Sequence, residues 1–280
     1  MKPVIAVEEI SVYATGLDHP ECLAFDRGGW LYAGGEAGQV YRVKPGGGEA
    51  EEICRLGGFS GGVAFTPDDE ELVVCNPLLG LVMVKRDGSH RVLATHAGEH
   101  KMICPNYAVF GKDGSLYVTD SGNWKKGNGR VMRFKGGRGE VVSGLLGYAN
   151  GLAISTENIL FMVESDTNSI KNFQILGDGS LGEVAHFAGE VGRLPDGLAM
   201  DEGGNLYASC YASDDVHRFS GDGGKREWLA HDPFGIVLSR PTNMAFGGEA
   251  GDEMFFANLG RTTITKVRVG VRGMRLANMR

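Results

Sequence analysis

The sequence predicts an all-β fold: a six-bladed β-propeller with four antiparallel strands per blade and a ring closed by the N-terminal strand. Three observations predict it: one strand-rich unit recurs six times, 45 of the 280 residues are glycine, and the apolar runs are too short for helices. Glycine at this frequency suits many strands joined by tight turns. We expect residues 1–280 to form a single propeller domain, with 269–280 as a short solvated tail.

Each copy of the unit holds a polar residue, an apolar run, a turn rich in Gly and Asp, and two further strand-like runs. The copies start at Glu21, Gly61, Asn106, Asn150, Asp196 and Asn243, so successive starts lie 40, 45, 44, 46 and 47 residues apart. A period of roughly 40–50 residues is the length of a four-stranded propeller blade. The first runs, such as CLAF at 22–25, are almost wholly apolar, which is typical of strands that line a packed centre.

The sixth copy lacks an outer strand of its own. Its third run, TTITKV, ends at residue 267, and no strand pattern follows it. Residues 10–16, ISVYATG, stand ahead of the first copy in the register of an outer strand. We therefore expect the N-terminal segment to complete the sixth blade, which removes the exposed edge that an open sheet would leave.

The composition excludes several classes of protein. With 28 Lys and Arg against 35 Asp and Glu, the formal net charge is −7, which disfavours binding to nucleic acid. The first residues contain no long apolar stretch, so we expect no signal peptide, no membrane span and a cytoplasmic location. The oligomeric state stays open, and a small-molecule substrate is the expected partner.

The cysteines do not form a recognisable framework. Five cysteines without a C-x-x-C pair argue against both a disulfide scaffold and a structural zinc site, and a free thiol in an apolar strand is most often a small core residue. His217, in a third strand, is interpreted as structural. The G-x-S-x-G match at 58–62 opens a β-blade and not a strand-to-helix turn, so we discount it as a nucleophile elbow.

Polar residues begin the innermost strands, and these strand starts converge at one end of a propeller's channel. Five of the six carry an oxygen donor: Glu21, Asn106, Asn150, Asp196 and Asn243. An all-oxygen set without His or Cys suits a hard cation, and Ca²⁺ tolerates irregular geometry better than Mg²⁺. Turn formation is the competing explanation for Asn and Asp, although Glu21 is not a favoured turn residue. Two carboxylates on a narrow axis also repel unless a cation or a proton lies between them.

The same face carries further candidates. Asp120 and Glu164 end second strands and could support ligands or substrate, or simply form surface turns. The loop at 120–129 offers Trp124 for stacking and Lys125 and Lys126 for anionic groups. The segment at 97–105 could overhang the pocket. An ordinary solvated loop is the alternative for both.

Four segments resemble the senescence-marker-protein (regucalcin)/gluconolactonase/luciferin-regenerating-enzyme family of six-bladed propellers. They are PECLAFD at 20–26, ANGLAIS at 149–155, PDGLAMDEGGNLYASCY at 195–211 and PTNMAFGG at 241–248. The resemblance implies one divalent cation held by Glu21, Asn150 and Asp196, with Asn106 as a fourth ligand or a substrate contact. It also implies lactone hydrolysis with Asp196 as the base. The third blade departs from typical sugar lactonases, because residues 104–108 read CPNYA instead of carrying N-D-G, with no arginine beside them.

The sequence thus predicts a divalent-metal-dependent hydrolase, in the first place a lactonase that opens a small lactone by attack of water. Ca²⁺ is the favoured cofactor, while Zn²⁺, Mn²⁺ or Mg²⁺ also suit an oxygen site. We expect substrate contacts from Asn106, Asp120, Trp124 and Asn243. Two alternatives stay open: a phosphotriesterase, because diisopropylfluorophosphatase-like enzymes carry the same Glu/Asn/Asn/Asp set, and a non-catalytic propeller that binds a partner.

Overall fold

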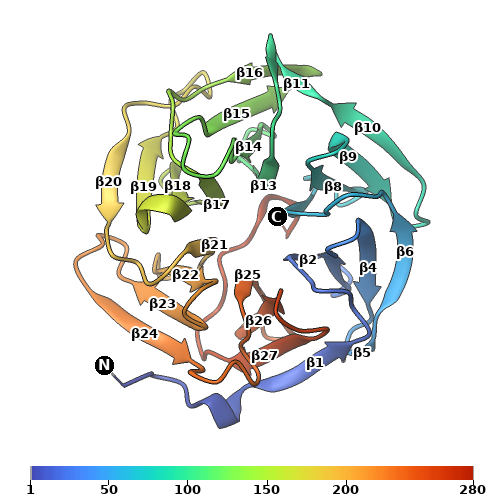
Figure 1. The fold of residues 1–280 in the computed structure, drawn as a ribbon, viewed down its shortest axis with the longest axis vertical. Coiled ribbons are helices and arrows are strands. Elements are labelled where there is room, and N and C mark those ends of the chain that lie inside the picture. The colour runs from blue at the N-terminus through green and yellow to red at the C-terminus, as the bar shows by residue number, and fades with distance from the viewer. Residues whose placement is uncertain (1, 280) are drawn as a thin grey trace.

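The computed structural model describes residues 2–279 and forms a ring of six four-stranded antiparallel sheets around a central channel (Figure 1). Blade one contains β2 (Cys22–Phe25), β3 (Leu31–Gly34), β4 (Gln39–Val43) and β6 (Glu51–Arg55); blade two contains β7 (Val63–Phe65), β8 (Glu71–Asn76), β9 (Gly80–Lys85) and β10 (His90–Ala94). Blade three contains β13 (Pro105–Phe110), β14 (Leu116–Asp120), β15 (Arg130–Lys135) and β16 (Arg138–Val141); blade four contains β17 (Ala149–Ile154), β18 (Ile159–Glu164), β19 (Ser169–Gln174) and β20 (Ala185–Ala188). Blade five contains β21 (Pro195–Met200), β22 (Leu206–Cys210), β23 (Asp215–Phe219) and β24 (Arg226–His231). The predicted architecture is confirmed.

Blade six is built from both ends of the chain. Its strands β25 (Pro241–Gly247), β26 (Glu253–Asn258) and β27 (Ile264–Arg268) are completed by β1 (Ser11–Thr15), which pairs antiparallel with β27. The short strand β5 (Gly48–Glu49) lies parallel to the outer edge of β1. The predicted closure by the N-terminal segment is therefore confirmed, and hydrogen bonds join the first strand of the chain to the last blade.

The hairpin between the first two strands of a blade has a recurring chemistry. In blade one, the Asp26 carboxylate accepts a hydrogen bond of 2.9 Å from the Trp30 amide, and Gly29 has φ +78°. Blade five repeats this turn with Asp201 and with Gly204 at φ +82°. The left-handed backbone favours glycine at this position, which explains why Gly recurs after Asp in successive copies.

The core lies between the faces of neighbouring blades. Between blades one and two, for example, Tyr32 and Phe65 pack edge to face with ring centroids 4.9 Å apart. The side chains of Tyr117, Tyr207 and Phe255 are fully buried in equivalent layers. Each sheet thus buries both of its faces, and the strands nearest the axis are held in place on every side.

The C-terminal segment closes the lower end of the channel, opposite the end at which the inner strands start (Figure 1). Its Asn278 side chain is buried and donates hydrogen bonds to the Phe25 carbonyl (3.0 Å) and to Asp69 Oδ1 (2.9 Å), and the Met274 amide donates to the Met200 carbonyl (2.9 Å). The expectation of a solvated tail is therefore wrong for this segment, because its polar groups find partners on the inner strands. Arg280 lies outside the described residues.

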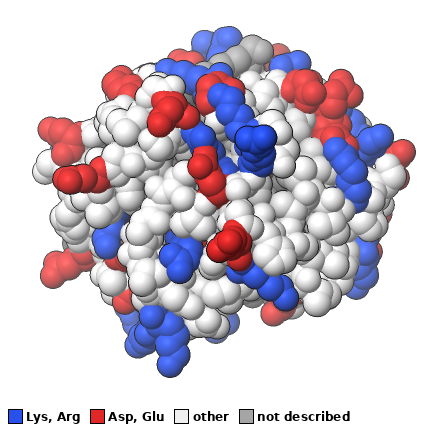
Figure 2. Space-filling view, turned by 90° about the horizontal axis from the view of Figure 1, so that it is seen from above, with Lys and Arg blue, Asp and Glu red and all other residues white. Residues whose placement is uncertain are grey.

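Two surface features bear on the expected partners. Among residues 2–279, no helix has the length and apolar character needed to cross a bilayer. On the face seen in Figure 2, Lys and Arg are interspersed with Asp and Glu and separated by uncharged surface. That face therefore presents no extended patch of one sign. The expectation that nucleic acid is not a partner stays a prediction.

Candidate metal centre and active site

Three of the predicted ligands meet at the upper mouth of the channel. Glu21, Asn150 and Asp196 stand at the starts of the inner strands of blades one, four and five. Burial and then the proximity of Asp196 raise the pKa of Glu21, and the Asn150 amide donates a hydrogen bond to Asp196. Asn106 holds the same place on β13 and is half-buried. Ring closure therefore gathers residues that are far apart in the sequence.

Two buried oxygens of this group have no hydrogen-bond partner: Glu21 Oε2 and Asn150 Oδ1. The orientation of the Asn150 amide is fixed, because its Nδ2 donates to Ser165 Oγ over 3.1 Å and so leaves the oxygen as the free end. A buried oxygen without a donor is destabilising by roughly 1–3 kcal/mol, so such atoms call for a cation or a proton donor. The set fits a divalent cation with oxygen ligands.

The carboxylates show the electrostatic signature of an acidic pair. Burial raises the pKa of Glu21 well above its usual range, and the nearby Asp196 raises it further. Burial also raises the pKa of Asp196 from 3.8 to about 8, against the opposing hydrogen bond from Asn150. Two like charges in a poorly solvated channel favour either retention of a proton or binding of a cation.

A belt of hydroxyl groups fixes the backbone around the mouth. Each hydroxyl on one blade donates to a carbonyl at the start of the next blade's inner strand. The bonds run from Thr119 to Asn150 (2.9 Å), Ser165 to Pro195 (2.6 Å), Ser209 to Thr242 (3.0 Å) and Thr242 to Glu21 (2.7 Å). Sequence reasoning missed these residues, although a Ser or Thr near the end of a second strand recurs in three of the copies. The belt holds the candidate ligands in register across blade boundaries.

Glycine allows the inner strands to approach one another closely at this level. A Cβ on Gly151 would collide with the Asp196 carbonyl, and a Cβ on Gly197 would lie 2.6 Å from the Thr242 carbonyl. These glycines directly follow Asn150 and Asp196 in the sequence. In the pairs Asn150-Gly151 and Asp196-Gly197, a candidate ligand is thus followed by a glycine that lets the neighbouring inner strands approach closely.

Larger side chains form a floor beneath the mouth. At the positions where blades four and five have glycine, blades one, three and six carry Cys22, Tyr107 and Asn243. The Asn243 Nδ2 lies 3.4 Å from Cys22 Sγ, and the Tyr107 hydroxyl lies 3.5 Å from Asn243 Oδ1. Below this layer, the inner strands and the C-terminal segment enclose an apolar cavity of about 100 Å³. The floor separates the polar mouth from this cavity.

The structure corrects the register assumed for the sixth blade. Pro195 pairs with Cys210 at the end of β22, and Pro241 pairs with Asn258 in the same way. The residue that corresponds to Asp196 is therefore Thr242 and not Asn243. Asn243 lies one position lower, in the floor, where its side chain already has partners. The expected substrate contact from Asn243 stays a prediction, now from below the ligand layer.

Asp120 and Glu164 organise the surrounding loops. The buried Asp120 carboxylate accepts hydrogen bonds from the amides of Ile103 (2.9 Å) and Cys104 (2.7 Å), which fixes the segment that leads into β13. Glu164 lies 2.8 Å from Lys171 Nζ. Burial acts to raise the pKa of Glu164, but the hydrogen bonds from Lys171, the Gly147 amide and Thr167 together outweigh it and lower this pKa. A loop-supporting role is thus visible for both. Direct contact of Asp120 with substrate stays a prediction.

The segment at 97–105 does not cover the mouth. Its hairpin, formed by β11 (His96–Ala97) and β12 (His100–Lys101), packs beside the outer strands of blade three (Figure 1). The predicted overhang is therefore wrong for this hairpin, and the rest of the segment returns to the axis along the amides held by Asp120.

An aromatic pair stands beside the acidic group. Trp124 packs edge to face against Tyr148, with ring centroids 5.0 Å apart, and remains 44% exposed. The Tyr148 hydroxyl lies 3.8 Å from Cys104 Sγ, and burial raises the pKa of Tyr148, with the charge of Asp196 contributing to the shift. Tyr148, two residues ahead of Asn150, escaped the sequence analysis. Trp124 is accessible to a substrate, and its predicted contact remains to be tested.

Known proteins share both the fold and the sequence pattern. The chain is 24% identical over 255 residues to the diisopropyl-fluorophosphatase of Loligo vulgaris, covering 79% of this chain and 80% of that one. A gluconolactonase from Xanthomonas campestris superposes with a TM-score of 0.77 at 21% identity, over 95% of this chain and 89% of that one. A calcium-binding protein, regucalcin from Agrobacterium tumefaciens, does so with a TM-score of 0.72 at 15% identity, over 96% and 99%.

Both structural likenesses are below 25% identity and establish the fold. The sequence match to the family extends from the first predicted ligand, Glu21, to the end of the last inner hairpin. Residues 21–259 match the family described as "SMP-30/Gluconolactonase/LRE-like region", and the chain belongs to this family.

Proposed function

We propose that this protein is a divalent-metal-dependent lactonase whose active site is the upper mouth of the channel. The observation that carries the proposal is the pair of unpartnered buried oxygens, Glu21 Oε2 and Asn150 Oδ1, beside the raised pKa of Asp196. Perturbed carboxylates that converge in a recess are typical of catalytic sites. The gluconolactonase likeness and the family assignment support the reaction class.

Glu21, Asn150 and Asp196 would hold the cation, with Asn106 as the fourth donor. When bound, a divalent cation polarises the lactone carbonyl and stabilises negative charge that develops on its oxygen. Ca²⁺ is favoured by the all-oxygen donors, and the calcium-binding regucalcin of the same fold supports this choice.

The protein's own groups then divide the remaining work. Asp196 would accept a proton from the attacking water at its carboxylate. The hydroxyl belt keeps Asp196 and Asn150 from shifting relative to each other. Asn106 donates from its amide to the ring oxygens of the substrate. Trp124 and Tyr148 offer an aromatic wall against which the substrate ring can pack.

A second candidate is hydrolysis of a phosphotriester. It is favoured by the 24% identity to the diisopropyl-fluorophosphatase of Loligo vulgaris over most of both chains. In that reaction the phosphoryl oxygen would replace the lactone carbonyl, and Asp196 would act as nucleophile or base. The donor set is compatible with both electrophiles.

A panel assay tests the proposal. Protein stripped with a chelator and reloaded with Ca²⁺ is assayed on aldonolactones, alkyl lactones and a phosphotriester, beside a Glu157→Gln variant as a surface control. Calcium-dependent turnover of a lactone supports the proposal, and turnover of the phosphotriester alone favours the second candidate. No turnover, together with a melting temperature indifferent to Ca²⁺, would instead indicate a non-catalytic propeller.

A further inference from the structure

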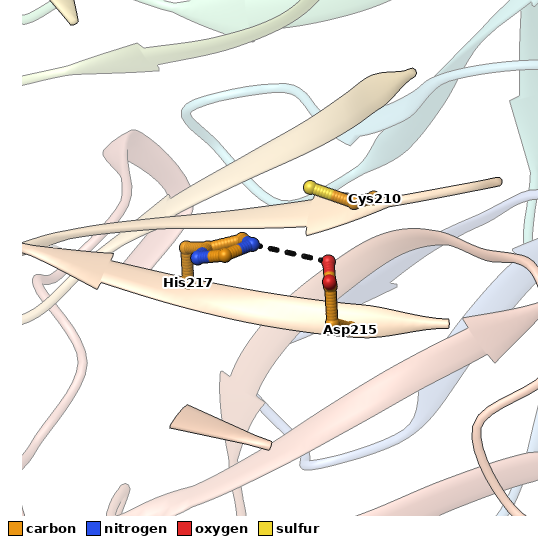
Figure 3. Close-up of side chains that lie close together, drawn as sticks. All are labelled: Cys210, Asp215 and His217. Atoms are coloured by element: carbon orange, nitrogen blue, oxygen red, sulfur yellow. Dashed lines mark ion pairs between the residues drawn. The ribbon is translucent and has the colours of Figure 1, made fainter. Parts of the chain in front are cut away.

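A second cluster of potential metal ligands lies inside blade five, on the neighbouring strands β22 and β23. Cys210 ends β22, and Asp215 and His217 lie two residues apart on β23, so that both side chains project from the same face of the strand (Figure 3). One ligand atom from each of the three residues lies within 4.8 Å of the other two, and all three residues are buried. The cluster thus combines sulfur, nitrogen and oxygen donors in one place.

The imidazole of His217 lacks a hydrogen-bond partner at either ring nitrogen, although the residue is only 1% exposed. Its Nε2 lies 3.2 Å from Asp215 Oδ1, close enough for an ion pair but without hydrogen-bond geometry (Figure 3). Buried histidines normally satisfy their nitrogens, so an imidazole held in this way calls for a partner that the protein itself does not supply.

The loop that leads into β21 packs closely over the cluster. A Cβ on Gly192 would lie 2.6 Å from Cys210 Sγ, 2.9 Å from His217 Nε2 and 3.2 Å from Asp215 Oδ1. All three ligand atoms therefore face the Cα of Gly192, and a larger residue at this position would collide with them. The preceding carbonyl, that of Val191, accepts a hydrogen bond of 2.8 Å from the Cys210 thiol and offers a fourth ligand oxygen on the same side.

We propose that Cys210, Asp215 and His217 form a zinc site, completed by the Val191 carbonyl. Zn²⁺ accepts thiolate, imidazole and carboxylate together in a four-coordinate site, whereas Ca²⁺ does not bind thiolate or imidazole well. The charges balance, because one thiolate and one carboxylate neutralise one divalent ion and the imidazole binds in its neutral form. The site is chemically distinct from the all-oxygen mouth.

Binding at this site couples to protonation and to the structure of a loop. In the metal-free protein the Cys210 thiol keeps its proton, which it donates to the Val191 carbonyl. Formation of the Zn–S bond breaks the S–H bond and releases that proton to solvent. The bound ion would join residues 191–192 to blade five, only four positions ahead of Asp196.

Cobalt provides the test, because a Co²⁺–thiolate bond gives a charge-transfer absorption that oxygen ligands do not give. The metal-free full-length protein is titrated with Co²⁺ and then with Zn²⁺. We expect one equivalent of the thiolate band, loss of the band when Zn²⁺ displaces Co²⁺, and a proton released per ion bound. Cys210→Ser should abolish the band, while Cys75→Ser, at an equally buried thiol in blade two, should retain it.

Two further variants keep the test decisive if Cys210→Ser folds poorly. Asp215→Asn should retain the thiolate band but weaken Zn²⁺ binding at least tenfold, because one neutralising charge is lost. Glu21→Gln should leave the thiolate band unchanged, since Glu21 belongs to the mouth. Absence of a thiolate band in the wild type, its persistence in Cys210→Ser, or its loss in Glu21→Gln would overturn the proposal.

Discussion

The hydroxyl of Tyr107, on the inner strand of blade three, lies 3.5 Å from the carboxamide oxygen of Asn243, on the inner strand of the opposite blade. This contact spans the channel below the candidate ligands and, together with Cys22, separates the polar mouth from the apolar cavity. The ring thus contains a transverse layer that no single blade could provide.

Removing the Tyr107 side chain should open that layer. Tyr107→Ala leaves a cavity and is expected to lower the free energy of unfolding by about 3–5 kcal/mol. Tyr107→Phe keeps the ring and loses only one long hydrogen bond, so we expect a loss below about 1 kcal/mol. Urea unfolding of both variants checks this. Equal losses for Phe and Ala would contradict a role in filling the channel.

Asp196→Asn tests the proposed base. The amide cannot accept the proton of the attacking water, so we expect the turnover number for the best lactone to fall about 10²–10⁴-fold. The amide is nearly the same size as the carboxylate, and the circular dichroism spectrum should therefore match that of the wild type. Hydrolysis at the wild-type rate by a folded Asp196→Asn protein would remove the assigned role.

The raised pKa values make stability depend on pH and calcium together. Because the pKa of Asp196 rises from 3.8 in the unfolded chain to about 8 in the folded protein, the metal-free folded state binds more protons between these values. Its stability should therefore fall as the pH rises from about 4 to about 8. Calcium favours both carboxylates in their ionised form, so the fall should disappear in excess Ca²⁺.

Melting temperatures measured across this pH range, with chelator and with Ca²⁺, check the linkage. The gain in melting temperature on adding Ca²⁺ should grow with pH, since fewer protons must be displaced. A calcium effect of equal size at pH 5 and pH 8 would show that Glu21 and Asp196 are not the groups that release protons.

Gly151→Ala tests the close approach of blades four and five. The added methyl group would meet the Asp196 carbonyl, so the strands must separate, and we expect about 1–3 kcal/mol of destabilisation with weaker Ca²⁺ binding. Gly144→Ala is the matched control, because nothing lies within 4 Å of its Cβ and its φ is not positive. Calorimetry without and with Ca²⁺ separates the loss of stability from the weaker Ca²⁺ binding. Equal melting temperatures of Gly151→Ala and Gly144→Ala under both conditions would argue against a close approach of blades four and five.

The sequence was sufficient for the ring and for most of the mouth. The spacing of the copies predicts the six blades, and the additional strand pattern at 10–16 predicts the closure of the ring. Both signals can be recognised because they reflect local sequence patterns. The alignment fails in blade six, where it begins the copy at Asn243 and not at Thr242, although Pro241 already marks the register that Pro195 sets in blade five. Asn243 lies one position below Thr242 on the inner strand, so its side-chain oxygen points into the floor and not into the ligand layer.

Contacts that depend on long-range packing escaped prediction. Nothing near Asn278 in the sequence indicates that its amide bonds to Phe25 and Asp69, since those partners belong to the first two blades. Cys210 and His217 were interpreted as ordinary strand residues; the pairing of β22 with β23 brings them together, and only the close approach of Gly192 from the preceding connection depends on long-range packing. In the sequence, the spacing of Asp215 and His217, which places both side chains on one face of a strand, was the only indication of the cluster.

The plugged lower end has a kinetic consequence. The C-terminal segment at the base and Tyr107 in the middle of the channel both lie below the ligand layer. On the proposed function, the acid product would therefore leave Asp196 through the upper mouth, along the path by which the next substrate molecule arrives. The product should therefore compete with substrate for the upper mouth. At high substrate concentration, the rate of turnover should fall as product accumulates, well before the substrate is exhausted.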